Sequence, residues 1–271
     1  MKPPVTRPRR SPLPSTEAGA WLLQLLLQLC AQAVKDVAKI PLWPSNSIHA
    51  LRKRMKKLQS LLRLVPPGAQ PAALRELRDS IRKLKGAVAA QRDTDVLSAL
   101  GRDLGGRTRP PQSAPIDPVP ILRLAYALTR QVHALDLAAL TWERVERRYQ
   151  KTCRRAQQAW QVARHQPEGE PLHDWRKRVK DLYYQTLALQ RWLRRPKRLR
   201  RTHQLGALLG HRLDLDLYRA QLKRARRRPP RKLLAEVKVR QARLTRRIFR
   251  RAKSVFDHSA PRLHPPARPR R

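Results

Sequence analysis

The stretch IHALRKRMKKL at residues 48–58 decides how this chain folds, because it occurs again as LHDWRKRVKDL at residues 172–182. The second copy keeps the His, the Arg-Lys-Arg run, the following Lys and the final Leu. A second echo, RDTDVL at residues 92–97 against LDLDLY at residues 213–218, lies at a similar distance behind each copy. Self-similarity of this kind indicates repeated structural units. We interpret the chain as a tandem duplication of one helical unit.

Each copy has the periodicity of an amphipathic helix. In the first copy, Ile48, Leu51, Met55 and Leu58 recur every three or four residues and form one apolar face. No segment shows the sustained alternation of a strand, so the sequence predicts an all-α fold with long antiparallel helices. Residues 119–165 could form one long bent helix or two. The expected helices cover residues 15–39, 45–65, 71–90, a short one from 93, then 119–140, 142–165, 172–193, 197–209, 214–226 and 231–257.

Segments rich in Pro and Gly divide the chain. We expect basic, proline-rich disordered tails at residues 1–15 and 258–271, with a helical domain at residues 16–257 between them. Within this domain, repeat one covers about 16–118 and repeat two about 119–257, joined by a Gly- and Pro-rich linker at 105–120.

The charge of the chain points to its partners. The formal net charge is +43, from 62 Lys and Arg against 19 Asp and Glu. A folded chain with this excess repels itself unless counterions or a polyanion neutralise it. Nucleic acid, polyphosphate and acidic membranes all qualify. Hydrophobic residues make up 41% of the chain, which is enough for a helical core and argues against wholesale disorder.

Basic side chains share helix faces in both repeats. Like charges at these spacings repel each other by a few tenths of a kcal/mol per pair, roughly, and phosphate oxygens would offset that repulsion. A solvated basic face is the alternative for any single helix, but the repetition around a His favours phosphate binding. The candidate phosphate-binding residues are His49, Arg52, Lys53, Lys56, Lys57, Arg78, Arg82, Lys85, His173, Arg176, Lys177, Lys180, Tyr184, Arg198 and Arg201. Ser60 extends the same face of the first copy.

Neither the histidines nor the paired aspartates predict a metal site or a catalytic site. His49 and His173 have no His or carboxylate one turn ahead and are surrounded by cations, so a hydrogen bond to phosphate suits them better than a metal. The aspartates could be carboxylates for acid/base or Mg²⁺ chemistry, but we favour a structural role. In that structural role, the first Asp of each pair caps the following helix, and the second Asp forms an ion pair with a basic side chain. These residues are Asp93, Asp95, Asp214 and Asp216.

Other sequence features suggest a cytoplasmic protein. Cys30 and Cys153 lie in helical runs without metal-ligand spacing and read as buried thiols in a reducing compartment. The apolar run at residues 20–30 imitates a signal peptide, but Gln24 and Gln28 interrupt it. No segment is apolar enough for a membrane span, so we expect no membrane partner.

The motifs resemble those of the CHAD domain, the conserved histidine α-helical domain. The resemblance lies in residues 48–58, 92–97 and 172–184, in Leu209-Gly210 ahead of Asp214, and in the segment from Tyr149 to Ala156. It covers about residues 16–257 and implies two tandem four-helix bundles related by pseudo-twofold symmetry, with a basic surface or central groove that binds inorganic polyphosphate without catalysis. Ala89 departs from the family pattern, which has Gly there, and Leu213 from its usual Arg or Asn.

The sequence therefore predicts a non-catalytic polyphosphate-binding protein that needs no cofactor. Some family members are fused to a β-rich triphosphate tunnel domain, and we expect this protein to be a standalone member. Such a protein would lie in the cytoplasm, where it could associate with polyphosphate granules. The alternative is a chromatin-like, nucleic-acid-binding protein, which the same charge and the basic tails support. Few aromatic residues lie on the basic faces for base stacking, and no recognition-helix motif is present. Phosphate loops and hydrolase or zinc-protease motifs are also missing from the sequence.

Overall fold

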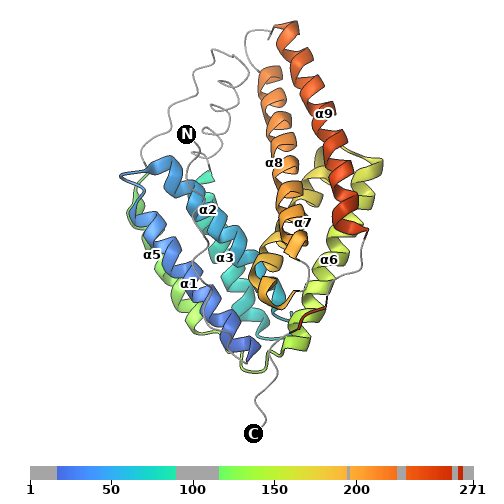
Figure 1. Ribbon diagram of the computed structural model, residues 1–271. Helices are drawn as coiled ribbons and strands as arrows, with labels where there is room; N and C mark the ends of the chain where they lie inside the picture. The colour runs from blue at the N-terminus through green and yellow to red at the C-terminus, as the bar shows by residue number, and fades with distance from the viewer. Residues whose placement is uncertain (1–16, 90–115, 194–195, 225–229, 258–261, 265–271) are drawn as a thin grey trace.

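The computed structural model describes residues 17–89, 116–193, 196–224, 230–257 and 262–264. The described residues form helices and no strand beyond one isolated bridge, which confirms the all-α prediction. Figure 1 shows two groups of helices that lie side by side and diverge toward the top of the view.

The first group contains four described α-helices. They are α1 (Ala18–Ala38), α2 (Pro44–Leu61), α3 (Pro71–Ala87) and α5 (Pro118–His133), with the short 3-10 helix η1 (Leu62–Leu64) after α2. Helix α1 packs against α2 and α5, and α3 packs against α5 and α2. Their apolar faces are fully buried, as the exposures of Leu22, Leu51, Leu77 and Leu128 show, each 0%.

The second group has longer helices. They are α6 (Trp142–His165), α7 (Gly169–Leu189), α8 (Pro196–Arg224) and α9 (Arg231–Phe256), with the 3-10 helix η2 (Gln190–Trp192) after α7. Each α-helix packs against the next in the chain, and α6 also touches α9. The far ends of α8 and α9 have an apolar cluster of their own around Leu215, Tyr218 and Val237.

The two groups meet where the repeated helices α2 and α7 pack against each other. The buried Ser60 of α2 donates its hydroxyl to the backbone oxygen of Asp181, 2.9 Å away, and the Gln185 side chain donates back to the Ser60 oxygen at 2.8 Å. A tryptophan cluster joins the groups near their base: the Trp142 ring centroid lies 5.2 Å from that of Trp21 and 4.4 Å from that of Trp192. The pseudo-twofold relation of the groups stays a prediction.

The structure decides two points that concern helix boundaries. Residues 119–165 form two helices and not one long bent helix, because α5 ends at His133 and Thr141 caps a new helix by accepting a hydrogen bond from the Arg144 backbone. Helix α8 runs without a break through residues 209–214, so the prediction that Asp214 caps a new helix is wrong. Asp216 pairs with Arg212 one turn away, as expected for the second aspartate. Asp93 and Asp95 lie outside the described residues.

Both cysteines are buried thiols without a disulfide partner. Burial raises the pKa of the Cys30 thiol to about 12, which keeps it protonated and unreactive at neutral pH. No helix in the described part of the chain is long and apolar enough to cross a lipid bilayer.

Candidate functional site

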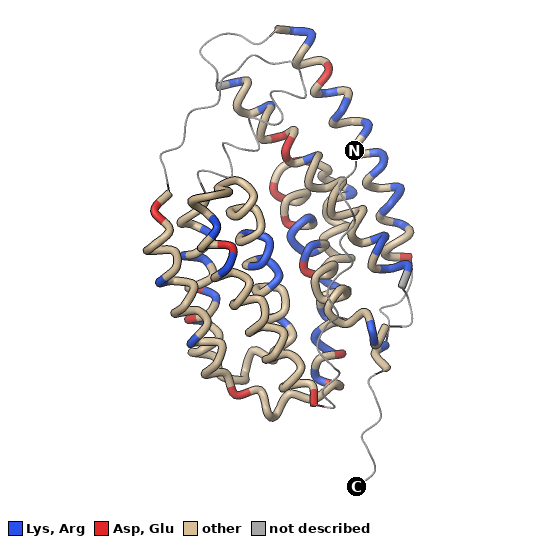
Figure 2. The backbone as a smooth tube through the Cα atoms, turned by 60° about the vertical axis from the view of Figure 1, so that its left-hand side comes forward, with Lys and Arg blue, Asp and Glu red and all other residues tan. Residues whose placement is uncertain are grey.

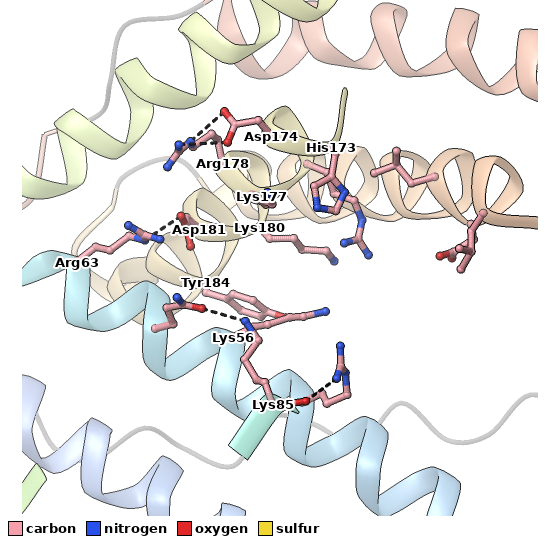
Figure 3. Close-up of a pocket in the computed structure, with 16 residues that line it drawn as sticks. Lys56, Arg63, Lys85, His173, Asp174, Lys177, Arg178, Lys180, Asp181 and Tyr184 are labelled. Atoms are coloured by element: carbon pink, nitrogen blue, oxygen red, sulfur yellow. Dashed lines mark hydrogen bonds and ion pairs between the residues drawn. The ribbon is translucent and has the colours of Figure 1, made fainter. Parts of the chain in front are cut away.

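A basic cavity of about 750 Å³ opens where α2, α7 and α8 come together, and Lys85 of α3 reaches it from the side. Eight Lys and Arg line it, against three Asp among the described lining residues. In Figure 3, Lys56 and Lys180 extend from opposite walls toward the same space. The lining residues are Arg52, Lys56, Gln59, Arg63, Lys85, His173, Asp174, Arg176, Lys177, Arg178, Lys180, Asp181, Tyr184, Leu213, Asp214 and Leu217.

The wall from α2 is one helical stripe. Arg52, Lys56, Gln59 and Arg63 follow each other every three or four residues, so their side chains leave the same face of α2 and η1. The Arg52 guanidinium donates to the backbone oxygen of Lys85, 2.9 Å away, near the C-terminal end of α3. A cation in this position also complements the negative end of the α3 dipole.

The wall from α7 repeats that stripe, with His173, Arg176, Lys180 and Tyr184 on one face. Glycines on the neighbouring helix α8 leave room for two of these side chains. A Cβ at Gly206 would stand 3.4 Å from Cε of Lys180, and a Cβ at Gly210 would stand 3.5 Å from Nη2 of Arg176. Arg176 and Lys180 therefore lie beside Gly210 and Gly206 of α8.

Ion pairs hold two of the three lining carboxylates at one end of the cavity. Asp181 of α7 forms an ion pair with Arg63 at 3.0 Å, which connects the two repeats. Asp174 forms an ion pair with Arg178 at 3.1 Å within α7 (Figure 3). Because these carboxylates are paired with cations inside the fold, the remaining lining cations dominate the field in the cavity.

Burial and mutual repulsion disfavour the charged forms of several basic side chains in the cavity. Burial, together with the charges of Arg176 and Lys53, lowers the pKa of Lys180 to about 8. Burial and the neighbouring Arg52 also lower the pKa of Lys85, and burial with the nearby Lys177 lowers the pKa of His173. Burial raises the pKa of Tyr184 to about 12, so its hydroxyl stays a hydrogen-bond donor. An anion in the cavity would relieve this repulsion.

Comparisons with known proteins agree with this architecture. The family model of the CHAD domain matches residues 29–131. A crystal structure of the CHAD domain from the plant Ricinus communis aligns with a TM-score of 0.61 at 17% sequence identity, over 96% of this chain and 100% of that one. The chain has the fold of a CHAD domain, and its residues 29–131 match the family model. No curated protein matches the sequence. At this identity the structural likeness shows the fold alone, and the family match falls mainly on the first repeat.

The fold gathers about half of the predicted phosphate-binding residues in the basic cavity. Both copies of the repeated helix contribute, so their basic stripes share one cavity and do not form two separate surfaces. The predicted residues that line it are Arg52, Lys56, Lys85, His173, Arg176, Lys177, Lys180 and Tyr184.

The other predicted residues lie outside the lining. Lys53 is close enough to Lys180 to lower its pKa, and burial lowers the pKa of Lys57, whereas His49 is exposed on α2. Arg78 lies close enough to Arg148 of α6 to contribute to the lowered pKa of that guanidinium. Arg82 pairs with Asp79, and its side chain is 78% exposed. Arg198 and Arg201 hold the bundle together: the first is buried against the Cys153 sulfur at 3.6 Å, and the second donates to the Ser254 backbone oxygen at 3.1 Å.

Sequence reasoning missed the polar residues that organise the cavity. Gln59 and Arg63 continue the α2 stripe by one and two turns, so the same periodicity that found Arg52 could have found them. Asp174 and Asp181 interrupt the basic pattern of the second copy, but nothing in the sequence shows that Asp181 faces Arg63 from the other repeat. Leu213 and Leu217 enter the lining because α8 continues as one helix.

Proposed function

We propose that this CHAD domain binds inorganic polyphosphate in the basic cavity and does not catalyse a reaction. The observation that carries the proposal is the convergence of cations from both repeats on one cavity, with the pKa of Lys180 already lowered to about 8 by burial and by its neighbours. A ligand with closely spaced negative charges would offset more of this repulsion than a single anion could.

The chemistry of the lining suits phosphate groups. Arg52 and Arg176 can each present paired donors to phosphate oxygens, while Lys56 and Lys180 provide compact point charges. The Tyr184 hydroxyl can add a neutral hydrogen bond, because its raised pKa keeps it protonated. A linear chain of phosphates could contact both walls at once.

Binding without turnover is the simpler chemistry for this site. Two carboxylates that could otherwise hold a metal, Asp174 and Asp181, are engaged with Arg178 and Arg63. No cluster of three or more His, Cys, Asp or Glu in the described part of the chain has metal-binding geometry. Binding of this kind would allow the protein to associate with polyphosphate granules.

The test is a titration of the full chain with polyphosphate of several defined lengths and with duplex DNA, at two salt concentrations. A variant with Gln at Arg52, Lys56, Arg176 and Lys180 should lose about 1,000-fold in polyphosphate affinity, which corresponds to about three charge-assisted hydrogen bonds of about 1.5 kcal/mol each. Circular dichroism should show unchanged helical content.

A matched control removes the same charge elsewhere. Lys35, Lys39, Arg123 and Arg130 are exposed on α1, its C-terminal end and α5, away from the cavity lining, and their replacement by Gln should cost less than about tenfold. Equal losses in the two variants would mean that only net charge matters. Displacement of bound polyphosphate by DNA at lower phosphate concentration would instead favour the nucleic-acid alternative.

A further inference from the structure

A second basic pocket, of about 470 Å³, lies between α8, α9 and the segment before α7. Four cations line it, Arg212, Arg219, Lys238 and Arg246, and Glu168 is the one acidic residue among its described lining residues. None of them belongs to the basic cavity described above, and none was singled out by its sequence pattern. We refer to this pocket as the hairpin pocket.

The floor of the hairpin pocket is a buried polar network. Arg212 is only 3% exposed; it pairs with Asp216 and donates to the Thr245 hydroxyl at 3.1 Å. Gln241, 5% exposed, donates to the same Asp216 carboxylate at 2.7 Å. These contacts join α8 to α9 and fix the spacing between the two helices, so the pocket is a built feature of the fold.

The cations on the rim of the hairpin pocket outnumber its one acidic residue among the described lining residues. Arg219, Lys238 and Arg246 make no ion pair with any carboxylate in the described part of the chain. Glu168 is exposed and can offset only part of their charge. The pocket thus has three rim cations that repel each other, which is the same condition that the basic cavity shows.

Helix α8 separates the two basic sites. Arg212 and Arg219 are about two turns apart and share one face of α8, whereas Leu213, Asp214 and Leu217 lie on the opposite face and line the basic cavity. A short ligand seated in one site therefore cannot touch the other, because the thickness of the helix lies between them.

The chemistry around the hairpin pocket selects phosphate over bases. Exposed cations continue along α9 at Arg243, Arg247 and Arg250, and Figure 2 shows the Lys and Arg residues at short intervals along this helix. The aromatic rings of α9 point inward instead: Phe249 stacks on Trp175 and Phe256 on Trp160. A surface with cations but no exposed ring contacts a phosphate chain and offers no stacking platform for nucleobases.

We propose that the hairpin pocket and the adjoining face of α9 form a second polyphosphate-binding site, so that one molecule holds two phosphate chains or two segments of one chain. The proposal rests on the polyphosphate binding proposed above, and it adds a consequence. A molecule with two sites on opposite faces of α8 cross-links long chains, whereas a molecule with one site only coats them.

The test compares three variants of the full chain by calorimetric titration with short polyphosphate of one defined length. In the hairpin variant, Arg219, Lys238 and Arg246 are replaced by Gln; in the cavity variant, Arg52, Lys56, Arg176 and Lys180 are. The control variant has Gln at Lys35, Arg123 and Arg130, which removes as much charge as the hairpin variant does. The control side chains are exposed, as are Lys238 and Arg246, whereas Arg219 is partly buried. Melting curves check that each variant folds.

The wild-type chain and the control should bind two equivalents, and the hairpin variant one equivalent at unchanged affinity. The cavity variant should keep one weaker equivalent. With long-chain polyphosphate, light scattering should report large assemblies for the wild type and at least a tenfold smaller signal for the hairpin variant. One equivalent for the wild type, with no change in the hairpin variant, would overturn the second site.

Failure of the proposed function has a different signature. If the cavity variant binds as the wild type does while the hairpin variant loses its only equivalent, the hairpin pocket is a site and the cavity is not. A duplex DNA that displaces the remaining equivalent of the cavity variant at lower phosphate concentration than polyphosphate does would also overturn the proposal, because the site would then recognise nucleic acid.

Discussion

The two copies of the repeated helix contribute to the same cavity in different ways. In the first copy, cations are engaged with the fold: Arg52 holds the Lys85 backbone oxygen and Arg54 pairs with Asp36 of α1. In the second copy, Arg176 and Lys180 lie along the glycine face of α8. Lys180 has its pKa lowered to about 8 there, so the unliganded protein keeps that charge at a cost. The two copies of one sequence thus form two walls with different neighbours, one against the end of α3 and the other against α8.

The largest effect that this comparison predicts concerns two double variants. Each removes two positive charges from the cavity, but the two should lose polyphosphate affinity to different extents. Replacing Arg176 and Lys180 by Gln should weaken polyphosphate binding by about 100-fold, which corresponds to two charge-assisted hydrogen bonds of about 1.5 kcal/mol each. Replacing Arg52 and Lys56 by Gln should weaken it by about tenfold and should also lower the melting temperature, because the Lys85 carbonyl loses its donor. Calorimetric titration and thermal melting measure both.

Equal losses from the two pairs would show that the repeats are equivalent in binding, whatever their contacts in the unliganded protein. The control is the replacement of Lys39 and Arg123 by Gln, which removes two exposed charges outside the cavity. Its effect on affinity estimates the part of each loss that comes from net charge alone.

The sequence predicted where the helices lie and which side chains share a helix face better than it predicted what each face contacts. Periodicity placed Ser60 and Arg198 on basic faces, yet Ser60 is buried where α2 crosses α7, and Arg198 is buried against Cys153. The reason is physical: spacing says which side chains share a face, whereas only tertiary packing decides whether that face meets solvent, a ligand or another helix. The shared cavity depends on the contact between α2 and α7, two helices far apart in the chain.

The hairpin pocket escaped sequence analysis for a related reason. Reading a break before Asp214 divided α8 into two helices, and the pocket exists only because α8 continues as one helix beside α9. Leu213 stands where Arg or Asn was expected, and it lines the basic cavity as an apolar residue inside the continuous helix. The repeat pattern also drew attention to what the two halves share, whereas the hairpin pocket belongs to the longer helices of the second half.

The next effect is a dependence of affinity on pH that comes from the second copy. Free Lys180 has a pKa of about 8, and a bound anion raises it, so binding takes up a proton at and above this pH. Affinity should be highest below about pH 8 and should fall by up to tenfold per pH unit as Lys180 loses its proton. The charges of Arg176 on α7 and Lys53 on α2 lower the pKa of Lys180 together with burial. His203 on α8 is neutral in this pH range, because burial lowers its own pKa.

Lys180→Arg is the matched control for this dependence, because the guanidinium stays protonated throughout the range. Titrations from about pH 7 to about pH 9.5 should show the fall in the wild type and a much flatter curve for the variant. Identical curves would assign the proton to another group, such as Lys85, whose pKa burial also lowers.

The smallest predicted effect comes from Gly210→Ala, which tests whether Gly210 is needed to make room for the Arg176 side chain or only lowers the stability of α8. A Cβ there would stand 3.5 Å from the Arg176 guanidinium, an ordinary contact, so Gly210→Ala should fit. It should stabilise α8 by about 0.5–1 kcal/mol, because Gly costs that much relative to Ala inside a helix, and raise the melting temperature by roughly 2–4 °C. Polyphosphate affinity should change by less than about twofold. Ala89 already occupies the corresponding place in the first repeat.

A larger side chain at the same position should behave differently. Gly210→Leu would fill the space that the Arg176 guanidinium now occupies and should lower affinity by about tenfold, the loss of one charge-assisted hydrogen bond. If Leu and Ala at position 210 gave the same affinity, Arg176 would not depend on the glycine face of α8. The second copy would then owe its part in binding to charge alone, and the distinction between the two walls of the cavity would be lost.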